Sequence, residues 1–477
     1  MPLVVIMASN IEKILETARK KTTPTKKERE KVQSLAATLV ERVKTWAKKE
    51  GIKAQVRVEG SVAKDTWLRD EPDIDIFMQV PTSTPREAFG TKCLNIAKKA
   101  TKGSKQIERF AEHPYLEAIV NSIRVNIVPC YQTKPGEWIS ATDRTPYHTD
   151  YVKPRLDGRL KAEVRLLKRF MKGTGVYGAE IKVGGFSGYL TELLTLHYGS
   201  FVDVLKSAAS WRHPWTIDYE SHYKGRESEL PKIFEEPLIV IDPIDKGRNV
   251  ASAVRKQRLD EFIAASRAFL KNPSLDFFYP KKTRPLKREN LLRAIRKRGT
   301  ALVFVRFGKT EAVPDILWGQ LYKTHRSLRK MLHQNDFNVL RSTVWSSEQN
   351  MSVFVFEAES RFLPVAKKHW GPPIDKRIEC ENFLRKHEKS AVTVSGPYIE
   401  DGRWAVEICR KHADVVDLLT EKLKDGGRQI GVAELISKTL ANSMKILVNE
   451  EIAKIYSSND DFARFLTEYI KGKPKWL

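Results

Sequence analysis

Cysteine is scarce in this sequence. The 477 residues include four cysteines, and no two of them form a CxxC pair. This spacing is not typical of a zinc site, and it does not form the disulfide framework of a small secreted domain. We therefore expect Cys93, Cys130, Cys380 and Cys409 to be buried, reduced thiols in a cytoplasmic protein.

Long apolar runs are also missing. No stretch approaches the roughly 20 apolar residues that a membrane-spanning helix needs. The run from Leu3 to Met7 is too short for the apolar region of a signal peptide, and no basic flank precedes it. We expect a cytoplasmic protein with no membrane partner.

Acidic residues are outnumbered by basic ones. Lys and Arg together number 84 against 59 for Asp and Glu, which gives a formal net charge of +25. Such an excess favours a polyanionic partner, because neutralised phosphates release their counterions. The alternative is a basic, solvated surface without a specific partner. We favour a nucleic acid.

The first 145 residues predict a small domain of mixed helices and strands, within a chain long enough for two to four domains. Apolar residues at three- and four-residue spacing, such as Val32, Leu35 and Leu39, predict a helix. Asn121-Ser122 suits a two-residue hairpin turn. The expected elements are helices at 27–50 and 85–99, and strands at 54–58, 73–80, 115–120 and 123–129.

The rest of the chain is predicted to be helical from 160 to about 215, with a helix at 252–270 and strands at 237–241, 301–307 and 351–356. Phe277-Phe278-Tyr279 precede a basic run at 281–298. Aromatic rings beside cations suit stacking on a nucleic-acid end. The alternative, equally open, places these rings in the protein core. We expect some of the cations to contact phosphate.

Gly60-Ser61, followed by Asp73-Ile74-Asp75, is the most informative motif. Side chains at i and i+2 of a strand point to the same face, so Asp73 and Asp75 can hold Mg²⁺ together. A Gly-Ser turn lets a backbone N–H and a hydroxyl approach phosphate oxygens. The combination predicts nucleotidyl transfer.

Further motifs follow in order along nearly the whole chain. They are Glu112-His113-Pro114-Tyr115, Val128-Pro129-Cys130-Tyr131, Asp143-Arg144-Thr145-Pro146-Tyr147-His148, Glu163-Val164-Arg165-Leu166-Leu167-Lys168, Val176-Tyr177-Gly178, Gly185-Phe186-Ser187-Gly188-Tyr189-Leu190, Asp242-Pro243, Arg248-Asn249-Val250 and Gly402-Arg403-Trp404. Gly60-Ser61 with Asp73-Ile74-Asp75 resembles the signature of the polymerase-β-type nucleotidyltransferase superfamily. The ordered set resembles the archaeal-type (class I) CCA-adding enzymes, which are tRNA nucleotidyltransferases.

This resemblance implies an α+β multidomain protein: a nucleotidyltransferase head at 1–150, a helical neck at 151–275, an α/β body at 276–400 and a tail at 401–477. It implies template-independent addition of C, C and A to the 3′ end of tRNA from CTP and ATP, by two-metal chemistry with Mg²⁺ and release of pyrophosphate. The expected partners are tRNA, CTP and ATP. A homodimer stays open.

The resemblance also implies roles for individual residues. Asp73 and Asp75 are the expected metal ligands and catalytic carboxylates. Arg248 occupies the place of an arginine that helps select C or A. The expected nucleotide-binding residues are Gly60, Ser61, Lys64, His148, Lys168, Tyr177 and Arg248.

Asn126 departs from the family pattern. In the family, the strand that ends in Val-Pro-Cys carries a third aspartate, which binds a metal and helps deprotonate the tRNA 3′ hydroxyl. An amide can ligate a metal but cannot act as a base. If Asn121-Ser122 form a hairpin turn, Glu117 pairs with Asn126 across the strands. One hypothesis is that Glu117 supplies the missing carboxylate; the alternatives are that Glu117 is only a hydrophilic strand residue or that Asn126 inactivates the site.

Two other functions stay open. One is a tRNA-binding homologue on the same fold that has lost catalysis through Asn126. The other is a poly(A)-polymerase-like enzyme, which shares the metal site but adds A without a limit.

Overall fold

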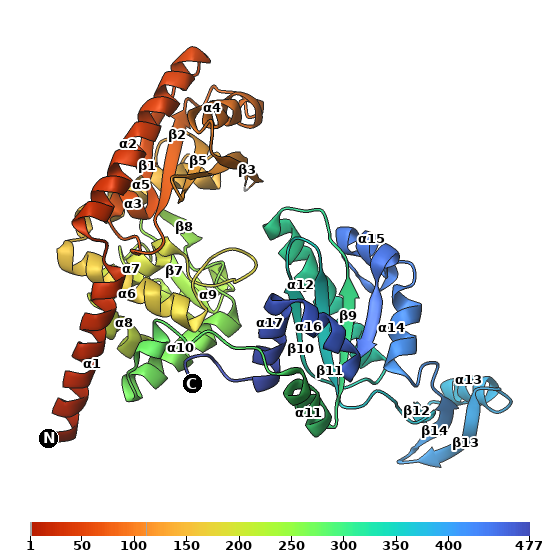
Figure 1. The fold of residues 1–477 in the computed structure, drawn as a ribbon. Helices are drawn as coiled ribbons and strands as arrows, with labels where there is room; N and C mark the ends of the chain where they lie inside the picture. Colours follow the sequence, from red (N-terminus) through yellow and green to blue (C-terminus); the bar gives the residue numbers. More distant parts are fainter. Residues whose placement is uncertain (1, 111) are drawn as a thin grey trace. The chain divides into compact units, whose positions relative to one another are not determined.

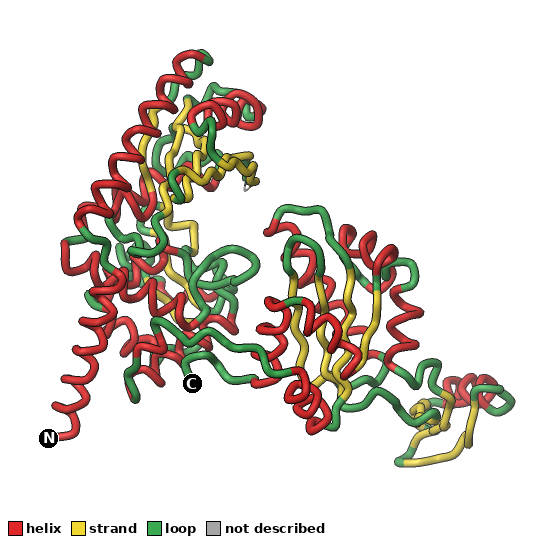
Figure 2. The backbone as a smooth tube through the Cα atoms, in the orientation of Figure 1, coloured by secondary structure: helices red, strands yellow, loops and turns green. Residues whose placement is uncertain are grey.

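The computed structural model describes residues 2–110 and 112–477, with side chains from residue 11 onward except at 111. Its contacts divide the chain into two units (Figures 1 and 2). The first comprises the chain up to Lys282 together with Pro474–Leu477, and the second comprises Thr283–Lys473. Both units mix helices and strands, so the predicted α+β class is confirmed.

The first unit begins with two long helices and a five-stranded sheet. The sheet has the order β1-β2-β5-β4-β3, with β2 and β5 parallel and the other neighbours antiparallel. Strand β2 has its predicted bounds, whereas β3 and the N-terminal helix α1 were not predicted. The elements are α1 (Pro2–Thr22), α2 (Lys26–Lys49), β1 (Gln55–Glu59), α3 (Gly60–Lys64), β2 (Asp73–Val80), a π-helix (Phe89–Cys93), α4 (Leu94–Ala100), β3 (Lys105–Phe110), β4 (Pro114–Val120) and β5 (Ile123–Tyr131).

The two faces of this sheet have different functions. Ile74, Ile76 and Met78 of β2 are fully buried and belong to the same core cluster as the apolar side of α2. Because side chains alternate along a strand, Asp73 and Asp75 point to the opposite face. One face of the sheet therefore stabilises the fold and leaves the other free for polar chemistry.

The rest of the first unit is mainly helical, around a core rich in phenylalanine. Phe277 and Phe278 are buried in this core, and Phe277 stacks on Phe170. Stacking of Phe277 and Phe278 on nucleic acid is therefore ruled out, and the core alternative is correct for these two rings. Tyr279 is only partly buried, with Lys21 and Arg169 near its ring. The elements are α5 (Thr145–Val152), α6 (Gly158–Thr174), α7 (Gly188–Tyr198), α8 (Phe201–Ala208), β6 (Trp215–Ile217), α9 (Leu230–Ile233), β7 (Leu238–Asp242), β8 (Asp245–Asn249) and α10 (Lys256–Lys271).

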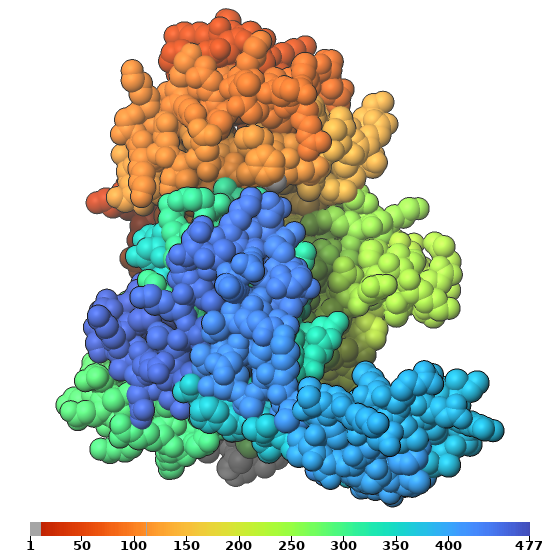
Figure 3. Space-filling model, turned by 90° about the vertical axis from the view of Figure 1, so that its right-hand side faces the viewer, coloured from red at the N-terminus to blue at the C-terminus, as the bar shows by residue number. Residues whose placement is uncertain are grey.

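The second unit contains a four-stranded sheet, β10-β11-β9-β15, and a three-stranded sheet, β12-β14-β13. Residues of the smaller sheet form a lobe of their own in lighter blue (Figure 3). The predicted boundary at residue 400 falls between the paired strands β13 and β14. The elements are α11 (Arg288–Arg298), β9 (Ala301–Phe307), α12 (Pro314–Gln334), β10 (Val339–Ser346), β11 (Ser352–Ala358), β12 (Ala366–Pro373), α13 (Arg377–His387), β13 (Thr393–Glu400), β14 (Arg403–Cys409), α14 (Val415–Leu423), α15 (Glu434–Ser443), β15 (Lys445–Val448), α16 (Ala453–Ser458) and α17 (Asp460–Lys471).

The cysteines are all free thiols. Cys93, Cys130 and Cys380 are buried as expected, but Cys409 is exposed, because it ends strand β14 of the small sheet. Among the described helices, none has the length and apolar character needed to cross a bilayer.

Candidate active site

Asp73 and Asp75 converge on the amide of Asn126. The parallel pairing of β2 with β5 places Asp75 beside Asn126 and Asp73 beside Arg124. The Asn126 amide nitrogen donates to Asp73 Oδ1 at 3.2 Å and to Asp75 Oδ1 at 3.0 Å. The two carboxylates that the sequence predicted to share a site therefore do so, with Asn126 between their strands.

Gly60 is required by its closeness to Asp75. It begins α3 directly after β1 and has a φ of +68°, in the left-handed region that favours glycine. A Cβ at this position would lie 2.2 Å from Asp75 Oδ2. Only glycine therefore permits both this turn and this position of the carboxylate.

The aspartate pair carries concentrated negative charge. Burial and the neighbouring Asp73 charge raise the pKa of Asp75 to about 7, although the residue keeps partial solvent exposure. Paired carboxylate oxygens that repel each other suit a hard divalent cation. The residues therefore fit one such cation.

Glu117 lies opposite Asn126, so the predicted hairpin register is confirmed. Its Oε1, however, accepts a hydrogen bond from Arg109 Nη2 at 3.0 Å. Asp75 is two strands away in the same row, about 9–10 Å between backbones. No cluster of three acidic, histidine or cysteine side chains suited to a metal occurs in the part of the chain described. The structure does not bring Glu117 to the aspartates.

Lys64 and Lys168 meet at a buried acid that the sequence did not single out. Lys64 Nζ lies 2.6 Å from Glu192 Oε2, and Lys168 Nζ lies 3.2 Å from Oε1. Lys168 also donates to the carbonyl and hydroxyl oxygens of Thr66, so its three N–H donors are used within the protein. Among the described residues, Glu192 is the one ion-pair partner of Lys64, so the Lys64 ammonium group keeps N–H donors for a ligand.

The charges in this group are mutually dependent. Burial alone would raise the pKa of Glu192, but the two lysines lower it to about 2. Burial lowers the pKa of Lys168 against the opposing effect of Glu192. Glu192 therefore stays ionised and holds both ammonium groups in place.

Two predicted hydroxyls remain available. Neither Ser61 Oγ nor Tyr177 Oη has a hydrogen-bond partner among residues 11–110 and 112–477. A Cβ on Gly188 would lie 3.0 Å from Tyr177 Oη and 3.8 Å from Lys168 Nζ. The Tyr177 hydroxyl therefore lies near the Lys168 ammonium group, next to Gly188 at the start of α7.

His148 and Arg248 meet at a second buried acid, Asp242. His148 Nε2 lies 3.0 Å from Asp242 Oδ2, and Arg248 Nη1 lies 2.6 Å from the same oxygen. Tyr189 donates to Asp242 Oδ1 at 3.0 Å and stacks on the His148 ring, with centroids 3.8 Å apart. Burial lowers the pKa of His148, even though Asp242 opposes this. A neutral His148 that donates from Nε2 leaves Nδ1 as an acceptor.

Tyr189 links this group to the lysines, because Lys64 Nζ lies 5.9 Å from its ring centroid. The sequence reasoning missed Glu192 and gave Asp242 no role. An acid amid the apolar residues of 188–198 was the available signal for Glu192. Asp242 ends the fully buried strand β7, which is a comparable signal.

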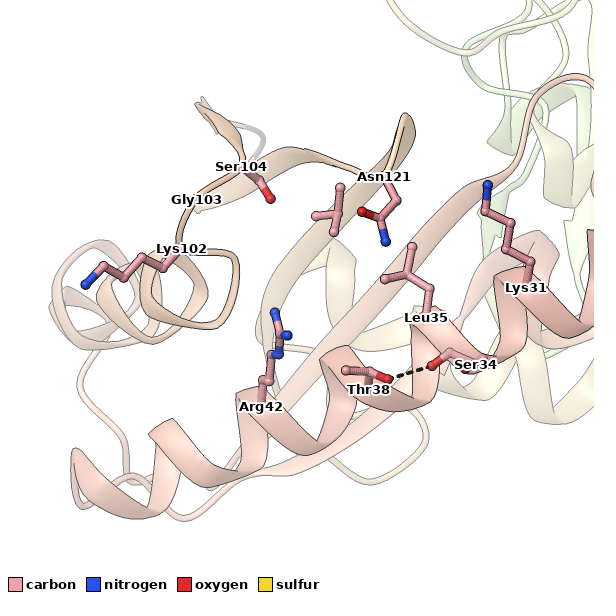
Figure 4. Close-up of a pocket in the computed structure, with 10 residues that line it drawn as sticks. Lys31, Ser34, Leu35, Thr38, Arg42, Lys102, Gly103, Ser104 and Asn121 are labelled. Atoms are coloured by element: carbon pink, nitrogen blue, oxygen red, sulfur yellow. Dashed lines mark hydrogen bonds between the residues drawn. The ribbon is translucent and has the colours of Figure 1, made fainter.

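A separate pocket of about 460 Å³ lies elsewhere in the same unit (Figure 4). It is lined by Lys31 and Arg42 of α2, by Lys102 after α4, and by Asn121 of the β4–β5 turn. None of the predicted site residues lines it. It is distinct from the aspartate site.

Three family models match the chain in succession. Residues 39–148 match the nucleotidyltransferase domain, and residues 162–279 match the second domain of tRNA nucleotidyltransferase. Residues 298–449 match the C-terminal domain of the CCA-adding enzyme. The fold and the aspartate site thus define a nucleotidyltransferase, a class that depends on divalent metal ions.

Relatives match over nearly the whole chain. The CCA-adding enzyme of Methanosarcina barkeri is 38% identical over 450 residues, which cover 94% of this chain and 96% of that protein. The CCA-adding enzyme of Methanopyrus kandleri is 36% identical over 485 residues, covering 98% of both. The chain belongs to the CCA-adding enzyme family, as the motifs indicated. Among solved structures, that of Escherichia coli MS115-1 CdnC with ATP aligns with a TM-score of 0.44 and 18% identity, covering 57% of this chain and 93% of that one.

Proposed function

We propose that this chain adds C, C and A to the 3′ end of tRNA from CTP and ATP, without a template, and releases pyrophosphate. The observation that carries the proposal is the near-complete match to CCA-adding enzymes, combined with two aspartates converging on one side of a strand. The formal charge of +25 supports binding of the polyanionic tRNA.

Asp73 and Asp75 hold the cation in this proposal, and Mg²⁺ is the ion that suits carboxylate and phosphate oxygens. A bound divalent cation would neutralise charge on the oxygens around the reacting phosphorus. Gly60 supports this role, because its missing side chain lets the Asp75 carboxylate occupy its position.

Lys64, Ser61 and Tyr177 are the proposed triphosphate ligands. Each of the three has at least one hydrogen-bond donor that no described residue occupies. Lys64 can also neutralise charge on the departing pyrophosphate. Lys168 has no spare donor in this arrangement, so we assign it a positioning role through Glu192. This role differs from the expectation that Lys168 itself binds the nucleotide.

Arg248 is the proposed base-selecting residue, and Asp242 fixes its guanidinium. His148 shares the same carboxylate. Because Nδ1 is an acceptor with no hydrogen bond to a described residue, His148 suits a sugar hydroxyl better than a phosphate oxygen. Asp242 thereby joins base selection and sugar binding in one hydrogen-bonded group.

The test is incorporation of labelled CTP and ATP, with Mg²⁺, onto tRNA that lacks its 3′ CCA. We expect the unmodified chain to add three nucleotides and then stop, and Asp73→Ala to abolish addition. Addition only after Asn126→Asp would instead identify a catalytically impaired tRNA-binding homologue. A lengthening run of A would identify a poly(A)-polymerase-like enzyme.

A further inference from the structure

Arg124 holds one of the two proposed metal ligands. It follows Ile123 at the start of β5 and lies beside Asp73 in the sheet. Its Nε donates to Asp73 Oδ1 at 3.0 Å and its Nη2 to Oδ2 at 2.5 Å. This is a bidentate pair between an arginine that is 54% exposed and a carboxylate that is 27% exposed.

Asn126 completes the arrangement. Its amide nitrogen reaches Oδ1 of both aspartates, so both oxygens of Asp73 and one oxygen of Asp75 are hydrogen-bonded within the protein. The remaining oxygen, Asp75 Oδ2, faces the backbone of Gly60. The carboxylates are thus held together by one guanidinium and one neutral amide.

The other carboxylates of this region have partners of their own among the described residues. Glu59, which lies opposite Asp75 across β1 and β2, is fully buried and pairs with Arg57 at 3.0 Å. Glu117 is paired with Arg109, and Glu71 pairs with cations of α6. In the described part of the chain, no cluster of three metal-binding side chains exists. The residues therefore fit one divalent cation and do not fit a protein-held pair.

The formal charges explain how one cation can suffice. Asp73, Asp75 and Arg124 together carry one net negative charge, and a divalent cation changes this to one net positive charge. Three carboxylates with two divalent cations reach the same net charge. Arg124 and Asn126 thus preserve the charge balance of a two-metal site with one cation fewer.

We propose that this chain holds a single divalent cation on Asp73 and Asp75, and that Arg124 supplies the positive charge of the second. This inference rests on the proposed function, and it replaces the two-metal chemistry that the family resemblance implies. Arg124 is a positioning residue here, because it acts through Asp73 rather than on the substrate.

The first test counts bound Mn²⁺ by electron paramagnetic resonance, in the presence of CTP and without tRNA. We expect one Mn²⁺ per unmodified chain. The double variant Asn126→Asp with Arg124→Gln should bind two, whose coupling broadens the signal because paired ions lie about 3.5–4 Å apart. Two Mn²⁺ in the unmodified chain would overturn the proposal.

The second test separates a charge-supplying arginine from one that only blocks the site. Arg124→Gln should tighten Mn²⁺ binding about fivefold, because a competing, partly exposed cation is removed. It should also lower kcat for CTP addition about 10²-fold, with little change in KM. Arg124→Lys keeps the charge and should recover part of kcat. An unchanged or higher kcat in Arg124→Gln contradicts the proposal.

The matched control is Arg109→Gln. It removes an arginine from the neighbouring strand β3, where the partner is Glu117. Neither the Mn²⁺ count nor kcat should change by more than about twofold, because Arg109 pairs with Glu117 and not with the aspartates. If no variant adds nucleotides, the proposed function fails, but the Mn²⁺ count still decides between one cation and two.

Discussion

Asp75 and Glu357 are acids on inner strands of two different sheets, and their surroundings differ. Glu357, on β11 in the second unit, accepts hydrogen bonds from Arg298, Thr300 and Arg341. Asp75, on β2 in the first unit, accepts one described hydrogen bond, from Asn126.

The pKa shifts follow this difference. Burial alone would raise the pKa of Glu357, but the hydrogen bonds from Arg298 and Thr300 bring it below its ordinary value. Burial and the Asp73 charge raise the pKa of Asp75 to about 7. Two arginines hydrogen-bond to Glu357, whereas no cation among the described residues hydrogen-bonds to Asp75. The lesson is that an incompletely compensated acid marks a ligand site better than burial does.

The largest effect is expected for Asp75→Asn. Loss of a carboxylate that holds the cation should lower nucleotide addition by about 10³-fold or more, since metal assistance is worth several kcal/mol. The midpoint of thermal unfolding should stay the same or rise, because repulsion from Asp73 is removed. Addition assays and thermal melts measure the two effects. A clear loss of stability would make Asp75 resemble Glu357 and break the comparison.

Glu192→Gln tests an intermediate case, since Glu192 is both satisfied by the protein and part of the site. It leaves the buried Lys64 and Lys168 without their anion, so the free energy of unfolding should fall by about 3–5 kcal/mol. KM for CTP should also rise, because Lys64 is no longer positioned. The control is Glu163→Gln, another buried acid, which pairs with Arg19. It should lose stability with no change in KM.

Glu357→Gln should do the reverse of Asp75→Asn. We expect a loss of about 2–3 kcal/mol in the free energy of unfolding, below the range for fully buried pairs because Arg298 and Arg341 are partly exposed. Nucleotide addition at a temperature where the chain stays folded should be unchanged.

The pH dependence of this loss has a definite sign. The folded pKa of Glu357 is lowered, so its stabilisation is present above the unfolded value of about 4.5 and is lost as the pH falls below it. Denaturant unfolding at pH 7 and pH 4 should therefore show a smaller difference between Glu357→Gln and the unmodified chain at pH 4. A difference that grows at low pH would contradict the assignment.

Sequence patterns predicted the carboxylate half of the site well. Strand β2, the shared face of Asp73 and Asp75 and the hairpin register of Glu117 with Asn126 all follow from the two-residue period of strands. The direction of the Glu117 side chain does not follow from register. It depends on Arg109, a residue of β3, and no sequence pattern indicated that strand.

The contacts of the two buried acids, Glu192 and Asp242, could not be predicted for a different reason. His148 and Asp242 are 94 residues apart, and Thr66 and Glu192 are 126 apart. No local period connects such residues, because their contact depends on the packing of elements that are far apart in the sequence. Phe277 and Phe278 show the same limit: an aromatic pair beside a basic run reads equally as core or as a stacking surface until the packing is known.

The smallest effect, and the most specific, is expected from two matched arginines. Arg248 and Arg341 are 35% and 37% exposed, and each pairs with a fully buried acid, Asp242 in the site and Glu357 in the second unit. Arg248→Ala should lower the preference for CTP and ATP over UTP and GTP about tenfold to a hundredfold, as the loss of a charged hydrogen bond of ~1.5–3 kcal/mol predicts. Affinity for tRNA should change less.

Arg341→Ala should reduce stability while base preference stays as in the unmodified chain. Competition between labelled CTP and UTP on one tRNA, with tRNA binding measured at the same salt concentration, separates the two effects. If both arginines changed base preference equally, selectivity would depend on general stability rather than on a side chain at the base. If Arg248→Ala left base preference intact, the Arg248–Asp242 pair would have only a structural role, as we expect for Arg341–Glu357. Arg248 would then not belong to the site.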